Sequence, residues 1–271
     1  MALHFTNRAW QLFDQQKVFD GNWYAGDVQQ VHRALVNCGT RPDVIGATHS
    51  LDGYKVLVSP CVMTLEDGDL AEKIRTFVEN GGVWVAGPLT DVRNDIGAHY
   101  TDRAMGMIED WLGVRLDYSV PTDGSVLRTA WEDGEDLAVR KWAELYTPGE
   151  GEKLASVTGG HSALTGKSVI SRHRVGKGEV ILCGALLEDA DLGKLMRIAL
   201  EDAGVETYGV MGALNVSPRS GEAGEGLVLC ETGCRDAILQ IGRPMTDILT
   251  GESFRGSVPV EPYGVRVLVN E

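Results

Sequence analysis

The chain has 271 residues, with 25 Lys and Arg against 39 Asp and Glu, and its formal net charge is −14. A surface this acidic repels nucleic acid and anionic lipid, so neither is an expected partner. No apolar run approaches the ~20 residues of a membrane span, and the N-terminus does not have the pattern of a signal peptide. The five cysteines include no CxxC pair and the six histidines no HxH or HxxxH pair, so no metal or other cofactor is expected. The expected setting is the cytoplasm, where the thiols stay reduced.

From residue 1 to about 205, the apolar pattern predicts strands that alternate with helices. The opening Ala2-Leu3-His4-Phe5 already predicts a strand, which suggests a segment of a longer chain. Further strands are expected at 42–45, 54–58, 83–86, 169–175 and 179–183, the last two forming a hairpin around Gly176-Lys177-Gly178. Helices are expected near 28–36, 70–78, 101–112 and 191–203, the third with Thr101 or Asp102 as its N-cap.

After about residue 206 the helical pattern stops. Short apolar runs between turns that contain Gly or Pro predict strands at 226–230, 237–241, 257–260 and 265–269. The chain is therefore expected to be α/β, with a flavodoxin-like (class I glutamine amidotransferase-like), doubly wound and mostly parallel sheet over residues 1–205. Residues 206–271 are expected to form a small antiparallel β-sandwich domain.

The stretch from Gly159 to Ser168, GGHSALTGKS, is close to a phosphate-binding loop. The motif GxxxxGK[ST] requires a glycine five positions before Gly166, and this chain has His161 there. Ser168 then opens the alternating run VISRHRV, which predicts a strand, whereas a phosphate site needs the N-terminus of a helix. We therefore expect a polar loop that leads into a hairpin, and not a nucleotide site.

Cys61 follows an expected parallel strand, where class I glutamine amidotransferases place their nucleophile. Those enzymes need a tight G-x-C-x-G turn, but this chain has Ser59-Pro60-Cys61-Val62-Met63. The sequence favours a partly buried, unreactive cysteine. An activated thiol, as in a pseudo-amidotransferase regulator, is the weaker alternative.

Two loops at the carboxyl edge of the expected sheet carry polar and aromatic side chains. Open α/β sheets usually bind ligands at this edge. One loop follows the first strand, and the other follows strand 83–86. The sequence favours a contact between subunits, and a small-molecule crevice is the alternative. The candidate residues are Asn7, Arg8 and Trp10 in the first loop and Asp91, Arg93, Asn94, His99 and Tyr100 in the second.

Six segments of the chain occur in the same order as similar segments of a known protein family. They are LDGYKVLVSP (51–60), LAEKIRTFVENGG (70–82), WLGV (111–114), RVGKGEV (174–180), LTGE (249–252) and EPYGV (261–265). As an ordered set they resemble glycoside hydrolase family 42, the β-galactosidases, over the part that follows the catalytic barrel. The closing LTGE and EPYGV segments make the resemblance fairly specific.

The resemblance implies a flavodoxin-like trimerisation domain followed by the small C-terminal β domain of that family. The catalytic glutamates of the family lie in the preceding (β/α)₈ barrel, so the resemblance gives this chain no catalytic residue and no cofactor. It implies a non-catalytic assembly role in a cytoplasmic homotrimer, within an enzyme that hydrolyses terminal β-galactosides. The alternative is a stand-alone flavodoxin-like carbohydrate-binding protein or enzyme that uses the crevice near Trp10, Asp91 and His99.

Overall fold

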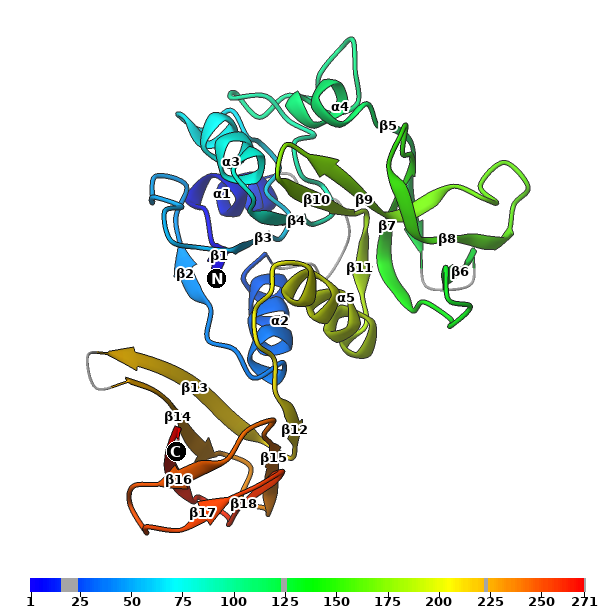
Figure 1. The fold of residues 1–271 in the computed structure, drawn as a ribbon. Coiled ribbons are helices and arrows are strands. Elements are labelled where there is room, and N and C mark those ends of the chain that lie inside the picture. The colour runs from blue at the N-terminus through cyan, green and yellow to red at the C-terminus, as the bar shows by residue number, and fades with distance from the viewer. Residues whose placement is uncertain (16–23, 123–125, 222–223, 271) are drawn as a thin grey trace. The chain divides into compact units, whose positions relative to one another are not determined.

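The structure is a computed structural model that describes residues 1–15, 24–122, 126–221 and 224–270 (Figure 1). The chain divides into two compact units. The first comprises Met1–Val31 with Asp43–Leu192, and the second comprises His32–Pro42 with Gly193–Glu271. The helices are α1 (Asn7–Gln15), α2 (Tyr24–Asn37), α3 (Leu70–Glu79), α4 (Met107–Leu112) and α5 (Asp189–Asp202). Along the described residues, no helix is both long enough and apolar enough to cross a membrane.

Part of the first unit is a parallel sheet built from short strands. Its order is β2-β1-β3-β4-β10, and all neighbouring pairs run parallel. These strands are β1 (Ala2–His4), β2 (Asp43–Ile45), β3 (Val56–Ser59), β4 (Val83–Ala86) and β10 (Gly178–Cys183). Every residue of β3 and β4 is buried, as expected of central parallel strands in an α/β fold.

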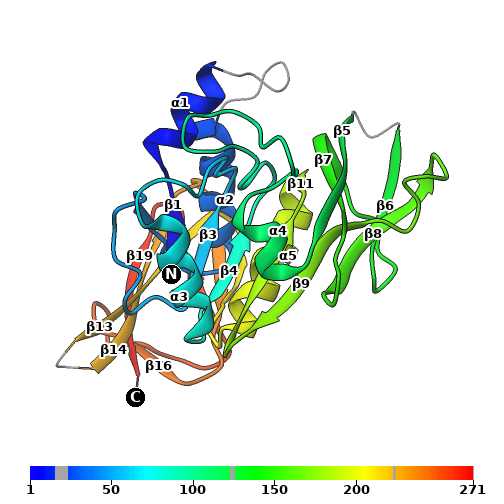
Figure 2. The ribbon, with the colours of Figure 1, turned by 90° about the horizontal axis from the view of Figure 1, so that it is seen from above.

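The same sheet continues as antiparallel strands. These are β5 (Arg115–Thr122), β6 (Leu127–Trp131), β7 (Val139–Thr147), β8 (Glu152–Gly160), β9 (Ser168–Val175) and β11 (Ala185–Leu187). The sequence pattern predicted β9 but missed β5, β6, β7 and β11. Figures 1 and 2 show β5 to β8 extending away from the parallel strands. Across the described residues the sheet has eleven strands and is mixed, so the expectation of a mostly parallel sheet was wrong in this part. Strands β8, β9 and β10 pair with their neighbours along the chain, whereas β5 pairs with β7 and β6 pairs with β8.

Helix α3 and a polar network hold the parallel strands together. The buried side chains of α3 are Leu70, Ile74, Phe77 and Val78, and the helix packs against β4 and β10. Inside the sheet, the Trp84 indole donates to Ser59 Oγ over 2.8 Å, and Ser59 Oγ lies 2.8 Å from His4 Nδ1. Burial lowers the pKa of His4 to about 4, so this imidazole is neutral at pH 7.

The predicted hairpin at the end of the first unit is confirmed. Strands β9 and β10 pair antiparallel, with His173 opposite Val180, and Gly176 in the turn has a φ of 58°. Gly178 is required by a close approach, because a Cβ atom there would lie 2.3 Å from the Val78 carbonyl oxygen.

The second unit contains two antiparallel sheets with one shared core, as predicted for the end of the chain. The first sheet has the order β12-β15-β18, with β12 (Gly209–Met211), β15 (Ala237–Gln240) and β18 (Ser257–Val260). The second has the order β13-β14-β19-β16-β17, with β13 (Leu214–Gly221), β14 (Gly224–Glu231), β16 (Met245–Asp247), β17 (Ser253–Phe254) and β19 (Val265–Asn270). Both sheets contribute to the apolar core, for example Leu239 and Val258 from the first and Val216, Leu229 and Leu268 from the second.

Candidate functional site

The loop after β4 is folded tightly against the segment that follows β3. Leu89 and Asp91 have φ angles of 60° and 62°, in the left-handed region that non-glycine residues rarely adopt. The Asp91 amide donates to the Val62 carbonyl over 3.0 Å, and the Arg93 amide donates to the Met63 carbonyl over 2.9 Å. Strained backbone of this kind persists only where surrounding contacts fix it, and it clusters at functional sites.

Asp91 is a buried residue of this loop, and its side chain binds a backbone amide of the helix that follows. The side chain is 1% exposed, and its Oδ2 accepts the Ile108 amide over 2.9 Å. The expectation that Thr101 or Asp102 caps this helix was wrong: α4 begins after Gly106, and the side chain that accepts the Ile108 amide is the distant Asp91. Burial raises the pKa of Asp91 to about 7, and the hydrogen bond from Ile108 opposes the shift.

Tyr100 is tied to the same loop through Glu66, a residue that the sequence did not single out. The Tyr100 hydroxyl lies 3.0 Å from Glu66 Oε1 and 3.0 Å from the Arg93 carbonyl oxygen. Glu66 Oε2 also accepts the Asp95 amide over 2.9 Å. One carboxylate therefore connects Asp95 to Tyr100 within this loop.

The candidates Asn7, Arg8 and Trp10 lie in the first turn of α1 and not in a loop, so the expectation of a loop after β1 was wrong. The Arg8 guanidinium donates to the Asp95 carbonyl and so joins α1 to the loop after β4. Trp10 is 43% exposed, and its ring meets Phe5 edge to face with centroids 5.3 Å apart. Asn7 is exposed.

Asn94 and His99 complete the predicted set. Asn94 Oδ1 accepts the Ala98 amide over 2.8 Å, which closes a tight turn in the loop. His99 is exposed, and its pKa is lowered by partial burial and by the neighbouring Arg93. Asn94 therefore shapes the loop, whereas His99 lies exposed on its surface.

A cavity of about 390 Å³ opens beside the loop. The predicted residues Arg93, His99 and Tyr100 line it. Trp142 and Glu144 of β7 also line it, and the sequence pattern identified neither of them because it did not predict this strand. The signal available was a carboxylate within the apolar run Trp142-Ala143-Glu144-Leu145-Tyr146.

Glu144 is the most deeply buried polar group of this cavity. It is 1% exposed, and its Oε2 accepts the Leu89 amide over 3.0 Å and the Tyr146 hydroxyl over 2.7 Å. Burial raises the pKa of Glu144 to about 7, and the hydrogen bonds from Tyr146 and Leu89 partly offset the shift. A carboxyl group that titrates near neutrality can accept or donate a hydrogen bond at this position.

The other two features of the sequence, the GGHSALTGKS stretch and Cys61, have structural roles. Strand β8 ends at Gly160 and β9 begins at Ser168, so residues 161–167 of GGHSALTGKS form the loop between them. Lys167 Nζ lies 2.7 Å from Asp117 Oδ2. Cys61 is 1% exposed and has a φ of 52°. Burial, with the nearby Asp27 and Glu144, raises the pKa of the Cys61 thiol well above its ordinary value, so the thiol is not activated.

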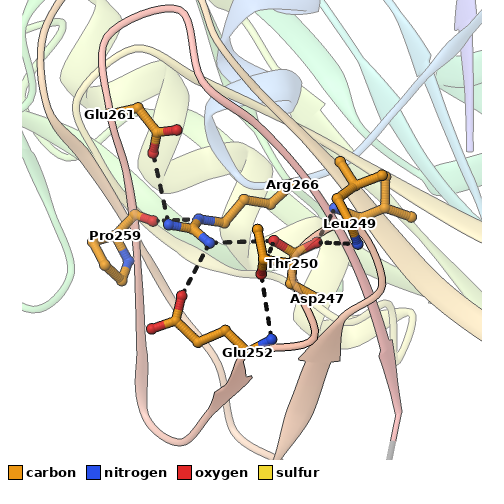
Figure 3. Close-up of polar contacts among 8 residues, drawn as sticks. Asp247, Leu249, Thr250, Glu252, Pro259, Glu261 and Arg266 are labelled. Carbon is orange, nitrogen blue, oxygen red and sulfur yellow. Dashed lines mark hydrogen bonds and ion pairs between the residues drawn. The ribbon is translucent and has the colours of Figure 1, made fainter.

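In the second unit, residues from the LTGE and EPYGV segments converge on Arg266 (Figure 3). Its Nε donates to the Pro259 carbonyl over 2.7 Å, and its Nη1 donates to Asp247 Oδ2 over 3.2 Å. Its Nη1 also lies 3.5 Å from Glu252, and its Nη2 lies 3.6 Å from Glu261. Burial alone would raise the pKa of Asp247, but hydrogen bonds from neighbouring amides, Thr250 and Arg266 lower it. These contacts give the two sequence segments a structural role.

The arrangement defines a mixed α/β domain with a structured loop at the carboxyl edge of its parallel strands, followed by a separate antiparallel β unit. Residues 1–206 match the family described as the beta-galactosidase trimerisation domain. The chain belongs to this family.

The chain is 28% identical to β-galactosidase YesZ of Bacillus licheniformis over 274 residues, which cover 99% of this chain and 40% of the relative. It is 26% identical to β-galactosidase YesZ of Bacillus subtilis, over 98% of this chain and 40% of the relative. The crystal structure of β-galactosidase from Bacillus circulans sp. alkalophilus has a similar fold, with a TM-score of 0.86 at 18% identity over 99% of this chain and 41% of that one. The chain therefore spans about two fifths of the relatives that it matches.

Proposed function

We infer that this chain is the assembly part of a larger β-galactosidase-like glycoside hydrolase. The observation that carries this conclusion is the match of residues 1–206 to the trimerisation-domain family. The proposed parent reaction is the hydrolysis of terminal β-galactosides, and the proposed partners are two further copies of the protein and a catalytic (β/α)₈ barrel in the parent chain. The proposed role of this chain is non-catalytic.

The proposal includes a flavodoxin-like domain over residues 1–205 and a β-sandwich domain over residues 206–271. Five parallel strands flanked by α3 support the first assignment, and two sheets with one core support the second. The proposed setting is the cytoplasm, which agrees with five cysteines that are free in the structure.

The proposed contact surface consists of the first turn of α1 and the loop 90–100. Trp10 is 43% exposed and Ile96 is 78% exposed, and the bond from Arg8 to Asp95 holds the two elements together. Large exposed apolar side chains on two elements that contact each other, with an arginine at that contact, are typical of protein interfaces.

Size-exclusion chromatography with light scattering over a range of protein concentrations tests the proposal. We expect a concentration-dependent trimer, which Ile96→Asp together with Trp10→Asp should weaken. Tyr118→Asp is the matched control, because Tyr118 is 41% exposed on β5, outside the proposed surface. A monomer at every concentration, for this chain and also for the full-length protein that contains it, would contradict the proposal.

A further inference from the structure

Buried polar atoms without a hydrogen bond gather around the cavity beside the loop. Arg93 Nε and Glu144 Oε1, both of residues that line it, have no hydrogen-bond partner within the described part of the chain. Buried polar atoms in folded proteins are nearly always hydrogen-bonded, so a group of exceptions at one place requires a physical reason. A bound polar ligand is such a reason, because it supplies the missing donors and acceptors.

The cavity has an open polar rim and a deeper apolar wall. His99, Arg103 and Ser119 at the rim are exposed, whereas Trp142 is 8% exposed and Glu144 is 1% exposed. Leu89, Val92 and Leu116 contribute apolar surface to the lining. A volume of about 390 Å³ lies near the lower end of the range of small-molecule sites, about 300–1,000 Å³. This size suits a mono- or disaccharide.

The charges of the lining select against charged ligands. An anion placed against Glu144 would meet a carboxyl group that becomes negatively charged as the pH rises through 7, and a cation at the rim would meet the Arg93 and Arg103 guanidinium groups. Arg103 is also ion-paired with Asp102 and Asp110, which leaves it little capacity to attract an anion. A neutral ligand with several hydroxyl groups avoids both repulsions, since each hydroxyl can donate to a carboxylate and accept from a guanidinium.

We propose that this cavity binds a neutral sugar of monosaccharide size, with Glu144 and Arg93 bonding its hydroxyl groups and Trp142 packing against its apolar face. The cavity shares His99 with the crevice expected from the sequence, but Asp91 and Trp10 are not among its lining residues. The proposal does not depend on assembly, because a chain that failed to trimerise would still bind the sugar.

Isothermal titration calorimetry of the 271-residue chain tests the proposal. The three probes share one sugar ring and differ in charge: neutral glucose, anionic glucuronate and cationic glucosamine. We expect saturable binding of glucose with a dissociation constant on the order of 1 mM. Binding of glucuronate and glucosamine should be weaker. No saturable heat with glucose, or tighter binding of either charged probe, would overturn the proposal.

Three variants locate the site. Glu144→Leu should weaken glucose binding about tenfold or more, because both carboxyl oxygens that can bond a sugar hydroxyl are lost. Leu116→Trp fills the cavity from a half-buried position and should abolish binding, and it decides the question if Glu144→Leu does not fold. Glu150→Gln, at a different cavity beside Trp111, should change the affinity less than twofold. Unchanged binding in folded Leu116→Trp would place the sugar elsewhere and overturn the proposal.

Discussion

Lys167 Nζ lies 2.7 Å from Asp117 Oδ2, so the lysine of the sequence GKS binds a carboxylate of its own fold. The same ammonium lies 3.1 Å from Thr147 Oγ1, and the contact therefore joins the start of β9 to β5 and β7. Partial burial would raise the pKa of Asp117, but hydrogen bonds from Lys167, Thr147 and Arg115 lower it to about 2. The stability that this carboxylate contributes is present above about pH 4 and is lost as the pH falls toward 2.

Replacing this lysine should destabilise the first unit. Lys167→Met removes one partner of Asp117 but leaves Thr147 and Arg115, so we expect a loss of about 1–2 kcal/mol in the free energy of unfolding at pH 7. Urea unfolding followed by circular dichroism measures the change. Lys177→Met, at an exposed position of the β9–β10 turn, is the control and should stay within about 0.5 kcal/mol. Equal effects of the two substitutions would contradict the structural role of Lys167.

Arg266 should be the most sensitive charged residue of the second unit. The Arg266 side chain is 13% exposed and that of Asp247 is 0% exposed, so Arg266→Met leaves a buried carboxylate without its cation. We expect a loss of about 3–5 kcal/mol in the free energy of unfolding, measured by thermal or urea denaturation. The double variant Arg266→Met/Asp247→Leu should recover part of this loss, since the unpaired charge is then absent.

Arg243 provides the matched control for this experiment. It also belongs to the second unit, but it is 44% exposed and lies 3.6 Å from Glu206 and 3.9 Å from Glu225. Arg243→Met should change the free energy of unfolding by less than about 1 kcal/mol. A loss as large as that of Arg266→Met would mean that net charge, and not the buried pair, sets the stability of this unit.

The parts of the fold that the sequence predicted have strong local signals. Strands β3 and β4 are continuous apolar runs, and α3 has an apolar stripe that ends at Gly81. Strand β5 gave no such signal, because most of its residues are at least partly exposed and Pro121 lies near its end. The antiparallel pairing of β5 to β8 therefore depends on tertiary contacts that local patterns do not report.

The residues of the candidate site also divide into those that the sequence could place and those that it could not. A strand followed by polar residues was enough to place Arg93, His99 and Tyr100 at the carboxyl edge of the sheet, and all three line one cavity. Glu144 could not be placed, because it meets Leu89 across 55 positions of the chain. The role of Asp91 was also hidden, since its contact with the amide of Ile108 exists only after the loop has folded.

The five cysteines should react at very different rates. Cys234 is exposed and Cys230 half-buried, whereas burial raises the pKa of Cys183 to about 12 and that of Cys61 well above its ordinary value. At pH 8 we expect iodoacetamide to label Cys234 first and the buried thiols at least about a hundredfold more slowly, through unfolding. Peptide mass spectrometry over time measures this order, and Cys234→Ser should remove the fast phase. Labelling of Cys61 as fast as Cys234 would instead indicate an activated, amidotransferase-like nucleophile.

Two groups of buried residues give the protein opposing pH dependences. The pKa of Glu144 and that of Asp91 are each raised by burial to about 7, so the stability that comes from their neutral forms is complete below about pH 4 and is lost as the pH rises through 7. The pKa of His4 and that of His173 are each lowered by burial from 6.5 to about 4, so their contribution is lost as the pH falls below 6.5. Both contributions change between pH 4 and 6.5, so the stability of the unmodified chain alone does not separate them. The informative quantity is the difference in the free energy of unfolding between a variant and the unmodified chain.

Glu144→Gln should separate the two trends. The amide imitates the neutral carboxyl group, so the variant should match the unmodified chain near pH 5 and exceed its free energy of unfolding at pH 8 by on the order of 3 kcal/mol, because each tenfold change in proton affinity corresponds to about 1.4 kcal/mol. Tyr146→Phe removes a hydrogen bond that favours the carboxylate, so it should retain the pH dependence and move it to higher pH. Urea unfolding at pH 5, 6, 7 and 8 tests both variants. If the stability of Glu144→Gln ran parallel to that of the unmodified chain at all four pH values, Glu144 would be ionised in the folded protein and the inferred neutral carboxyl would be wrong.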